Sequence, residues 1–223
     1  MTNSSKVDKR YFYTTIIGLL LMTILSVTKI VPNLSLSGLT VLVGVVSFFI
    51  TDSFEKRVPI KSGLRFKTFF SDLKQDGVLP LVFLPVFLSI ATLLIGDVLF
   101  KGAFRSHVLE RTSSMLSFDK LLLLMVQIII AAFGEEIAWR GFFLGKLLKM
   151  LPFWFCAILS SLLFAIAHIA TGNVELVRFD VLMIFIDSLI YARIYKKTEN
   201  CLVTSLSHIL ANATGIIFLL MLK

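Results

Sequence analysis

Charged residues and cysteines are scarce in this sequence. Of its 223 residues only 16% are charged, whereas 57% are hydrophobic and the mean hydropathy is +0.91. A soluble domain typically carries about 25% charged and roughly 45–50% apolar residues, so this composition excludes a soluble globular enzyme. The two cysteines, Cys156 and Cys201, lie in or beside apolar runs. They form no Cys-x-x-Cys motif and indicate no disulfide framework, and they leave the cellular compartment open.

The apolar residues are concentrated in runs that are long enough to cross a membrane as helices. A spanning helix needs about 20 residues, so seven spans would occupy most of the chain and leave room for short loops only. The first run is too long for a signal peptide and lacks a small-x-small cleavage site, so we interpret it as a spanning helix. The sequence therefore predicts an all-α, polytopic transmembrane helical bundle of about seven spans. The runs lie near Phe12–Val31, Leu34–Ile50, Val78–Phe100, Phe118–Leu148, Pro152–Ala170, Phe179–Tyr195 and Cys201–Leu222.

Two connections between the runs have a distinctive composition. Pro32 and Asn33 predict a tight turn between the first two spans. Asp52–Asp76 interleaves apolar residues with basic ones. We expect this connector to lie along the lipid headgroups, in part as an amphipathic helix.

Positively charged residues outnumber negatively charged ones, at 22 Lys and Arg against 14 Asp and Glu, for a net charge of +8. In a membrane protein such residues gather in cytoplasmic loops and near anionic headgroups, so no nucleic-acid partner is expected. With the N-terminus inside, 14 of the 22 fall on the cytoplasmic side and 7 on the outer side, and Arg140 lies within the fourth run. This bias predicts a multi-pass protein of the cell membrane whose N-terminus is cytoplasmic.

Ionisable and amide side chains interrupt three of the apolar runs. A charge at the centre of a spanning helix costs about 2.5–3.5 kcal/mol on insertion scales, so such residues indicate a functional site. Glu136 and Arg140 are four residues apart on one helix face and can pair, whereas Glu135 points about 100° away. Taken singly, a histidine or asparagine in a span can also be a helix–helix hydrogen bond. The candidate residues are Glu135, Glu136 and Arg140 in the fourth run, Phe164 and His168 in the fifth, and His208 and Asn212 in the seventh.

The positions of these residues along their helices allow them to meet. The fourth and fifth runs form a hairpin, with Glu135 about 15 residues before its turn and His168 about 17 after it, so their depths differ by about 3 Å. His208 lies about 10 residues from the cytoplasmic end of its helix. If the basic end of the fourth span projects beyond the bilayer, we expect the site in the cytoplasmic half of the membrane.

Other polar residues in the runs have simpler interpretations. Asp187 lies in the middle of the sixth run, where an unpaired carboxylate is costly, and we expect it to pair with Arg140 or to orient a histidine. Asp97 and His107 lie at loop edges and are interpreted as structural. The serines near the histidines lack a Gly-x-Ser-x-Gly elbow, which disfavours covalent serine catalysis.

Three motifs occur complete and in order on three separate predicted spans. They are Glu-Glu-x-x-x-Arg at residues 135–140, Phe-x-x-x-His at 164–168 and His-x-x-x-Asn at 208–212. In this combination the sequence resembles the CAAX protease and bacteriocin-processing membrane proteases, also called the Abi family. The resemblance covers residues 118–223, which it identifies as the catalytic core. Residues 1–117 are then N-terminal transmembrane helices with the amphipathic connector.

For this family the resemblance implies an intramembrane endopeptidase that hydrolyses a peptide bond with water. Glu135 would be the general base that activates the water, helped by His168. His208 and Asn212 would donate hydrogen bonds to the oxyanion. Neutral donors aimed at a developing oxyanion gain strength in a water-poor cavity.

The remaining candidates would support this centre. The resemblance implies that Glu136 and Arg140 organise the site, and we place Phe164 and Asp187 beside them as supporting residues. The pairing of Glu136 with Arg140 would keep the site from holding two free negative charges.

A metal ion is the open question for the chemistry. Glu135, His168 and His208 are a candidate three-ligand zinc set, the number that a catalytic site needs. The sequence has no His-Glu-x-x-His motif, and the family has been described both as metalloproteases and as metal-free glutamate proteases. We expect no cofactor, with zinc as the alternative.

Two further functions compete with the protease. The protein could be a non-catalytic membrane immunity or scaffold protein that binds a peptide partner. A small transporter that uses the buried charges as a proton relay is disfavoured, because the sequence has no internal repeats or matched Gly/Pro-interrupted helices.

The expected partners are a peptide or membrane-protein substrate and the lipid bilayer. A short chain such as this resembles the bacterial members, associated with bacteriocin self-immunity or peptide maturation.

Overall fold

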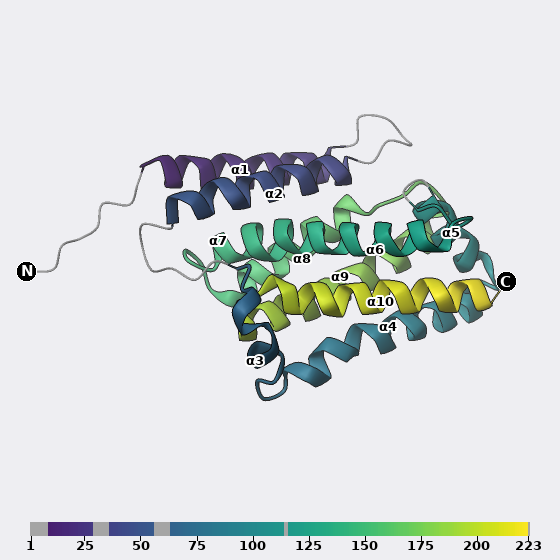
Figure 1. Ribbon diagram of the computed structural model, residues 1–223. Coiled ribbons are helices and arrows are strands. Elements are labelled where there is room, and N and C mark those ends of the chain that lie inside the picture. Colours follow the sequence, from purple (N-terminus) through teal and green to yellow (C-terminus); the bar gives the residue numbers. More distant parts are fainter. Residues whose placement is uncertain (1–8, 29–35, 56–62, 114–115, 223) are drawn as a thin grey trace, which may run out of the picture.

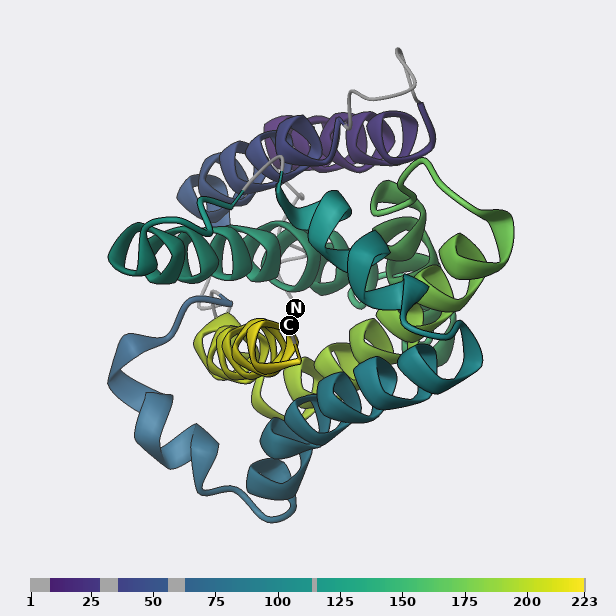
Figure 2. The same cartoon turned by 90° about the vertical axis from the view of Figure 1, so that its right-hand side faces the viewer.

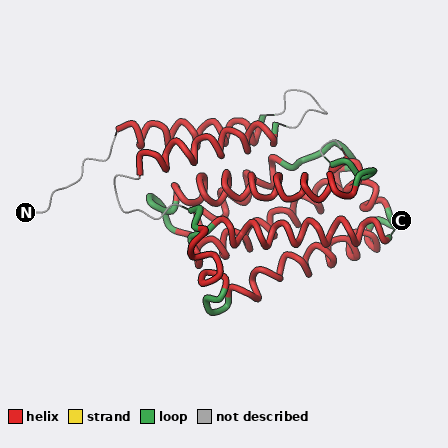
Figure 3. Tube along the Cα trace, viewed as in Figure 1, coloured by secondary structure: helices red, strands yellow, loops and turns green. Residues whose placement is uncertain are grey.

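A computed structural model describes residues 9–28, 36–55, 63–113 and 116–222. Within these ranges the chain is helical with short connections, and it contains no strand (Figure 3). The apolar runs form helices because a membrane offers no water to backbone N–H and C=O groups, and a helix satisfies these groups internally. The predicted all-α bundle is confirmed.

Each predicted span corresponds to one long helix. The seven are α1 Lys9–Val27, α2 Ser37–Glu55, α4 Val78–Leu99, the continuous helix formed by α6 Leu121–Glu136, η2 Ile137–Leu144 and α7 Gly145–Leu147, α8 Phe153–Ala167, α9 Val174–Thr198, and α10 Cys201–Met221. Three short segments lie between them, namely η1 Phe66–Thr68, α3 Phe69–Leu73 and α5 Ala103–Ser113.

Five of the long helices have both the length and the composition to cross a membrane. They are α1, α2, α4, the continuous α6–η2–α7 helix and α10. α8 is apolar but has only 15 residues, which corresponds to about 22 Å. α9 is long enough, but charged residues occur along most of its length. The chain is a multi-pass membrane protein, and five of its seven predicted spans meet both criteria among the described residues.

The long helices run back and forth between two ends of the molecule (Figure 1). One end carries α3 and α7 and is called the α3 end. The other carries α5 and the end of α10, is called the α5 end, and faces the viewer in Figure 2. Cys201 N–H donates to Gly63 O (2.6 Å) at the α3 end, whereas Arg105 donates to the carbonyl oxygen of Leu222 at the α5 end. Segments that are distant in sequence are therefore tied together at both ends.

The α1–α2 hairpin forms a layer on one side of the bundle (Figure 1). α2 packs against η2, where Phe48 and Phe142 belong to the buried core. A Cβ atom at Gly44 would lie 2.5 Å from the Cβ of Ala138. Only glycine lets the two helices approach this closely.

The continuous fourth helix changes type immediately after the paired glutamates. η2 is a π-helix of eight residues, all of them buried. A π-helix has a wider turn than an α-helix, is rare, and occurs frequently at functional sites. Here it places Arg140 in the interior next to Glu136.

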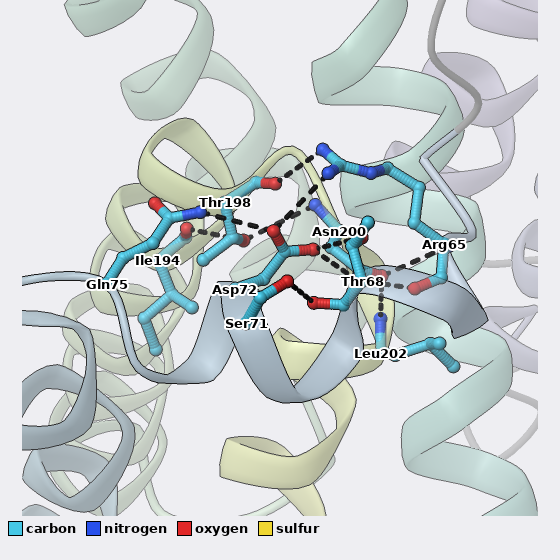
Figure 4. Close-up of polar contacts among 9 residues, drawn as sticks. All are labelled: Arg65, Thr68, Ser71, Asp72, Gln75, Ile194, Thr198, Asn200 and Leu202. Atoms are coloured by element: carbon cyan, nitrogen blue, oxygen red, sulfur yellow. Dashed lines mark hydrogen bonds and ion pairs between the residues drawn. The ribbon is translucent and has the colours of Figure 1, made fainter.

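The connector between α2 and α4 is fastened to the start of α10. The carboxylate of Asp72 in α3 accepts hydrogen bonds from Arg65 (3.3 Å), Thr68 (2.6 Å), Gln75 (3.2 Å) and Asn200 (2.9 Å) (Figure 4). Asn200 is also the N-cap residue of α10, because its side chain accepts from the N–H of the second helical residue. One buried carboxylate thus links α3 to the α9–α10 junction.

Two predictions concern residues that are described in part or not at all. The turn at Pro32–Asn33 lies outside the described residues, as do residues 56–62 of the connector. The described part of the connector contains η1 and α3, whose Phe66 and Phe70 side chains are exposed. Its position along the headgroups stays a prediction.

Candidate functional site

Glu135 lies between two histidines. Its Oε1 atom is 3.9 Å from Nε2 of His168, and its Oε2 atom is 3.8 Å from Nε2 of His208. The three residues come from α6, from the end of α8 and from α10. The structure therefore brings together one candidate from each of the three motifs.

His168 owes its position to the shortness of α8, which ends there instead of crossing the whole bundle. Its Nδ1 atom is 2.7 Å from the carbonyl oxygen of Phe164. A carbonyl oxygen can only accept, so Nδ1 carries the hydrogen, and Nε2 of the neutral ring presents its lone pair toward Glu135. The Phe164 ring packs against the imidazole, with centroids 4.5 Å apart.

The second glutamate belongs to a fully buried ion pair. Glu136 and Arg140 are 3.1 Å apart (Oε1 to the guanidinium) and are 0% and 2% exposed, so the predicted pairing across one turn is present. The same carboxylate oxygen accepts from Nδ1 of His208 at 2.9 Å. Arg140 also donates to the backbone oxygen (3.1 Å) and hydroxyl (2.8 Å) of Ser188 in α9. These contacts link α10, the α6–η2–α7 helix and α9 through one chain of polar groups.

Aromatic rings form a layer beneath these polar groups. The Tyr191 ring stacks on His208 with centroids 4.8 Å apart and an interplanar angle of 24°. The Arg140 guanidinium lies 4.8 Å from the centroid of Phe164 and 5.2 Å from that of Tyr191. Trp139 meets Phe164 edge to face at 5.7 Å. Cation–π contacts of this kind are strongest for a desolvated cation, and the Arg140 side chain is 2% exposed.

A cavity of about 500 Å³ adjoins the site and is lined by Glu135, His168 and His208. Asn212 also lines it, one turn after His208 on α10. The Asn212 side chain makes no hydrogen bond within the described part of the chain, so its amide can bind a ligand in the cavity. Six polar groups of the three motifs therefore lie in the cavity wall or directly behind it.

Asp187 is placed differently from its prediction. It lines the cavity, but Arg140 contacts Glu136 and Ser188 instead. Adjacent residues of a helix point about 100° apart, so turning Ser188 toward Arg140 turns Asp187 away. Its Oδ1 atom is buried and has no hydrogen-bond partner among the described residues. The predicted pair with Arg140 is wrong, and neither histidine forms a hydrogen bond with Asp187.

The two residues interpreted as structural make ion pairs at the α5 end. Asp97 pairs with Arg105 at 2.6 Å. His107 is 6% exposed within α5, and its Nε2 atom lies 3.3 Å from Asp180 of α9. Arg111 pairs with the same oxygen of Asp180 at 2.8 Å. His107 is therefore part of a buried cluster rather than a loop edge.

The candidate zinc set does not have the arrangement of a metal site. Among the described residues, no three His, Cys, Asp or Glu side chains are grouped so that they could hold a metal ion. His168 and His208 each face a different oxygen of Glu135 at 3.8–3.9 Å.

Two residues that contact the site were not predicted from the sequence. Tyr191 and Ser188 lie in the apolar sixth run, where an aromatic or a hydroxyl side chain is ordinary. Tyr191 follows Asp187 by one helical turn, so the two residues share a helix face. The carboxylate of Asp187 marks this face in the sequence and could have identified Tyr191 as a site residue.

Comparison of the sequence with known protein families gives a match over the part of the chain that contains the site. Residues 117–214 match the family described as Type II CAAX prenyl endopeptidase Rce1-like. The matched region begins just before α6 and ends within α10, so it includes Glu135, His168, His208 and Asn212. Neither a curated protein nor a solved structure matches the chain.

Proposed function

Residues 117–214 of this chain match the Rce1-like family, and on that premise we propose that the protein is an intramembrane endopeptidase using a glutamate-activated water. The family supports CAAX-type protease activity in a membrane. The observation that carries the mechanism is the position of Glu135, whose two oxygens each face the Nε2 atom of a histidine inside a cavity.

The separations around Glu135 suit a single water molecule. Distances of 3.8 and 3.9 Å are too long for direct hydrogen bonds, but a water among the three groups can bond to each of them. Glu135 takes one proton of this water as the water oxygen attacks the peptide carbonyl carbon. Nε2 of His168 accepts a hydrogen bond from the other water hydrogen and so orients the water. Glu135 then gives its proton to the leaving amine nitrogen as the C–N bond breaks.

Asn212 and His208 would stabilise the negative charge that develops on the carbonyl oxygen. The free Asn212 amide donates one hydrogen bond. His208 donates from Nε2 when its ring is protonated, because its Nδ1 hydrogen already bonds to Glu136, whose carboxylate then balances the imidazolium charge. One such donor contributes about 2.7–4 kcal/mol in a well-studied protease.

The cellular role is proposed at a coarser level. The resemblance to bacterial members favours peptide or protein processing, or self-immunity to bacteriocins, at the cell membrane. The competing function is a non-catalytic immunity or scaffold protein that binds a peptide partner in the same cavity. The two functions differ in whether they require Glu135: the protease needs this carboxylate for cleavage, whereas the scaffold does not need it.

The test compares wild type with Glu135→Gln in detergent and in liposomes, using a library of quenched fluorogenic peptides. Loss of a general base lowers kcat by about 10²–10⁴-fold, and we expect a loss in this range. Glu175→Gln is the matched control, because Glu175 is an exposed carboxylate in the first turn of α9. Equal cleavage by Glu135→Gln and wild type would refute the mechanism. Equal protection of cells by the two proteins, without cleavage, would favour the scaffold.

We also propose that catalysis needs no metal ion. Dialysis against a zinc chelator is expected to leave kcat/KM unchanged, with a known zinc protease as the positive control. Loss of cleavage that is restored by added zinc would overturn this proposal.

A further inference from the structure

The cavity extends from the site toward one end of the molecule only. Its wall includes Ser37 at the start of α2, Glu110 and Arg111 in α5, Thr171 in the loop before α9, and Leu219 near the end of α10. All of these residues belong to elements at the α5 end. The cavity therefore leads from Glu135 to the α5 end.

In the opposite direction the lining residues stop at the site. The last ones toward the α3 end are Phe164, Tyr191 and His208. Beyond them lies the buried aromatic core of η2, including Trp139 and Phe142. Among the described residues, none from η2, α7 or α3 lines this cavity. The site is thus the floor of a one-sided cavity.

The cavity wall at the α5 end includes charged and hydroxyl groups beside apolar residues such as Val108 and Leu116. α5 contributes Glu110, Arg111 and Thr112 to the wall. This helix is held over α9 by the buried Asp180, which binds both His107 (3.3 Å) and Arg111 (2.8 Å). Charged and hydroxyl groups at a cavity mouth favour water there, and so the mouth can open to the aqueous phase rather than to lipid.

Positive charge indicates which side of the membrane each end faces. Basic residues of membrane proteins are enriched on the cytoplasmic side. The α3 end carries Lys9, Arg10, Arg65, Lys67, Lys74, Lys146, Lys149, Arg193, Lys196 and Lys197, whereas the α5 end carries Lys101, Arg105, Arg111, Lys120 and Arg178. The described residues thus repeat the two-to-one bias of the whole sequence, and this bias predicts that the α5 end is the outer one.

We propose that the site is reached from the outer, non-cytoplasmic face, through a mouth rimmed by α5, and that its substrate is a peptide segment on that side. The statement that a peptide on that side is cleaved rests on the proposed protease function, whereas the access path does not. Along α10 the site lies about 10 Å from the α3 end and about 20 Å from the α5 end. A centre in the cytoplasmic half can therefore still draw its substrate from outside, provided that the substrate enters as an extended chain.

Cysteine accessibility tests the access path without requiring activity. Ser89 lies in the middle of α4 and lines the cavity, whereas Phe87, two residues away on the same helix, is 67% exposed on the outer surface of the bundle. We expect a small, permanently charged methanethiosulfonate applied to intact cells to modify Ser89→Cys. Phe87→Cys at nearly the same depth should face lipid and react at least about tenfold more slowly, because the reactive form of a thiol is the thiolate.

Two controls define the background and the sidedness. Both native cysteines are 0% exposed, so the unsubstituted chain gives the background. Lys149→Cys at the exposed α3 end should react in inverted vesicles and not in intact cells. Modification of Ser89→Cys only in inverted vesicles, or at the rate of Phe87→Cys, would overturn the proposed access path.

A cleavage measurement then tests the substrate side. A membrane-impermeant fluorogenic peptide, first shown to be cleaved in detergent, should be cleaved by intact cells and not by sealed inverted vesicles. Cleavage in inverted vesicles alone would refute access from outside. If no peptide is cleaved even in detergent, the protease proposal fails while the labelling result still decides the access path.

Discussion

The His208 ring is held on two sides by different kinds of contact. Glu136 accepts its Nδ1 hydrogen at 2.9 Å, and Tyr191 covers one face of the ring at a centroid distance of 4.8 Å. The hydrogen bond fixes the direction of Nε2, and the stacked ring limits rotation about the side-chain bonds. Both contacts matter for catalysis, because a misplaced donor loses contact with the developing oxyanion.

Replacing Tyr191 should therefore impair catalysis even though it contacts no reacting atom in the proposed mechanism. An aromatic pair contributes about 0.5–1.5 kcal/mol beyond its buried area, so we expect Tyr191→Leu to lower kcat by roughly 2–10-fold. Tyr191→Phe keeps the stacked ring and should restore kcat to near wild type. Peptide cleavage assays of the three proteins test this, with KM measured separately. A loss of activity in Tyr191→Phe as large as in Tyr191→Leu would assign the effect to the hydroxyl instead.

Ser188 gives a second prediction at this scale, because it binds the buried Arg140. Ser188→Ala removes a hydrogen bond to a charged group, and we expect it to lower the free energy of unfolding by about 1.5–3 kcal/mol. Ser160→Ala is the matched control, since Ser160 is also buried, but its hydroxyl donates to the carbonyl oxygen of Ala157 within its own helix and contacts no charged group among the described residues. Chemical denaturation in detergent measures both variants. Equal destabilisation by the two would contradict the assigned role.

The sequence predicted contacts within one helix of the site, but it did not predict contacts between two helices. The pairing of Glu136 with Arg140 follows from spacing along a single helix, and the structure contains it. The choice between Ser188 and Asp187 as the partner of Arg140 depends on the rotation of α9 about its axis, which no spacing within one run specifies. The stacking of Tyr191 on His208 also depends on this rotation of α9.

At the scale of elements, long apolar runs located the seven long helices, but two other features were not predictable. α5 has a polar composition and its position depends on Asp180 of another helix. The π-helix η2 keeps the apolar sequence of an ordinary span. α2 crosses η2 at Gly44, where the two backbones approach closely, and the pattern of a single run does not specify such a contact.

Gly44 therefore tests the crossing of these two elements. A Cβ atom at this position would lie 2.5 Å from the Cβ and 2.9 Å from the Cα of Ala138. We expect Gly44→Ala to push α2 away from η2 and to destabilise the protein by about 1–3 kcal/mol, as overpacking does. Gly38→Ala on the same helix meets no atom within 4 Å and should be neutral or stabilising by up to about 1 kcal/mol. Melting temperatures of the two variants in one detergent check the contrast, and a stabilised Gly44→Ala would refute it.

At the scale of the whole molecule, a buried carboxylate fastens each end of the bundle. Asp72 is 3% exposed and binds the connector to the start of α10 (Figure 4). Asp180 is 4% exposed and binds α5 to α9. Helix association within a membrane receives little hydrophobic driving force, so polar contacts and close packing must specify how the helices are arranged. The two carboxylates do this at opposite ends, and among the described residues the cavity lining extends from the site toward the end fastened by Asp180.

These two clusters should contribute to stability independently of each other. Asp180 and Thr198, which lies beside the Asp72 cluster, are 18 residues apart on α9, or about 27 Å. Asp72→Asn and Asp180→Asn each weaken hydrogen bonds to a charged acceptor, and we expect each to lower the free energy of unfolding by about 1.5–3 kcal/mol. In the double variant the losses should add to within about 0.5 kcal/mol, as for distant sites. Asp180→Asn combined with Arg111→Gln should not be additive, because both changes break one ion pair. Strong coupling between Asp72 and Asp180 would instead mean that the bundle transmits strain from one end to the other through the site.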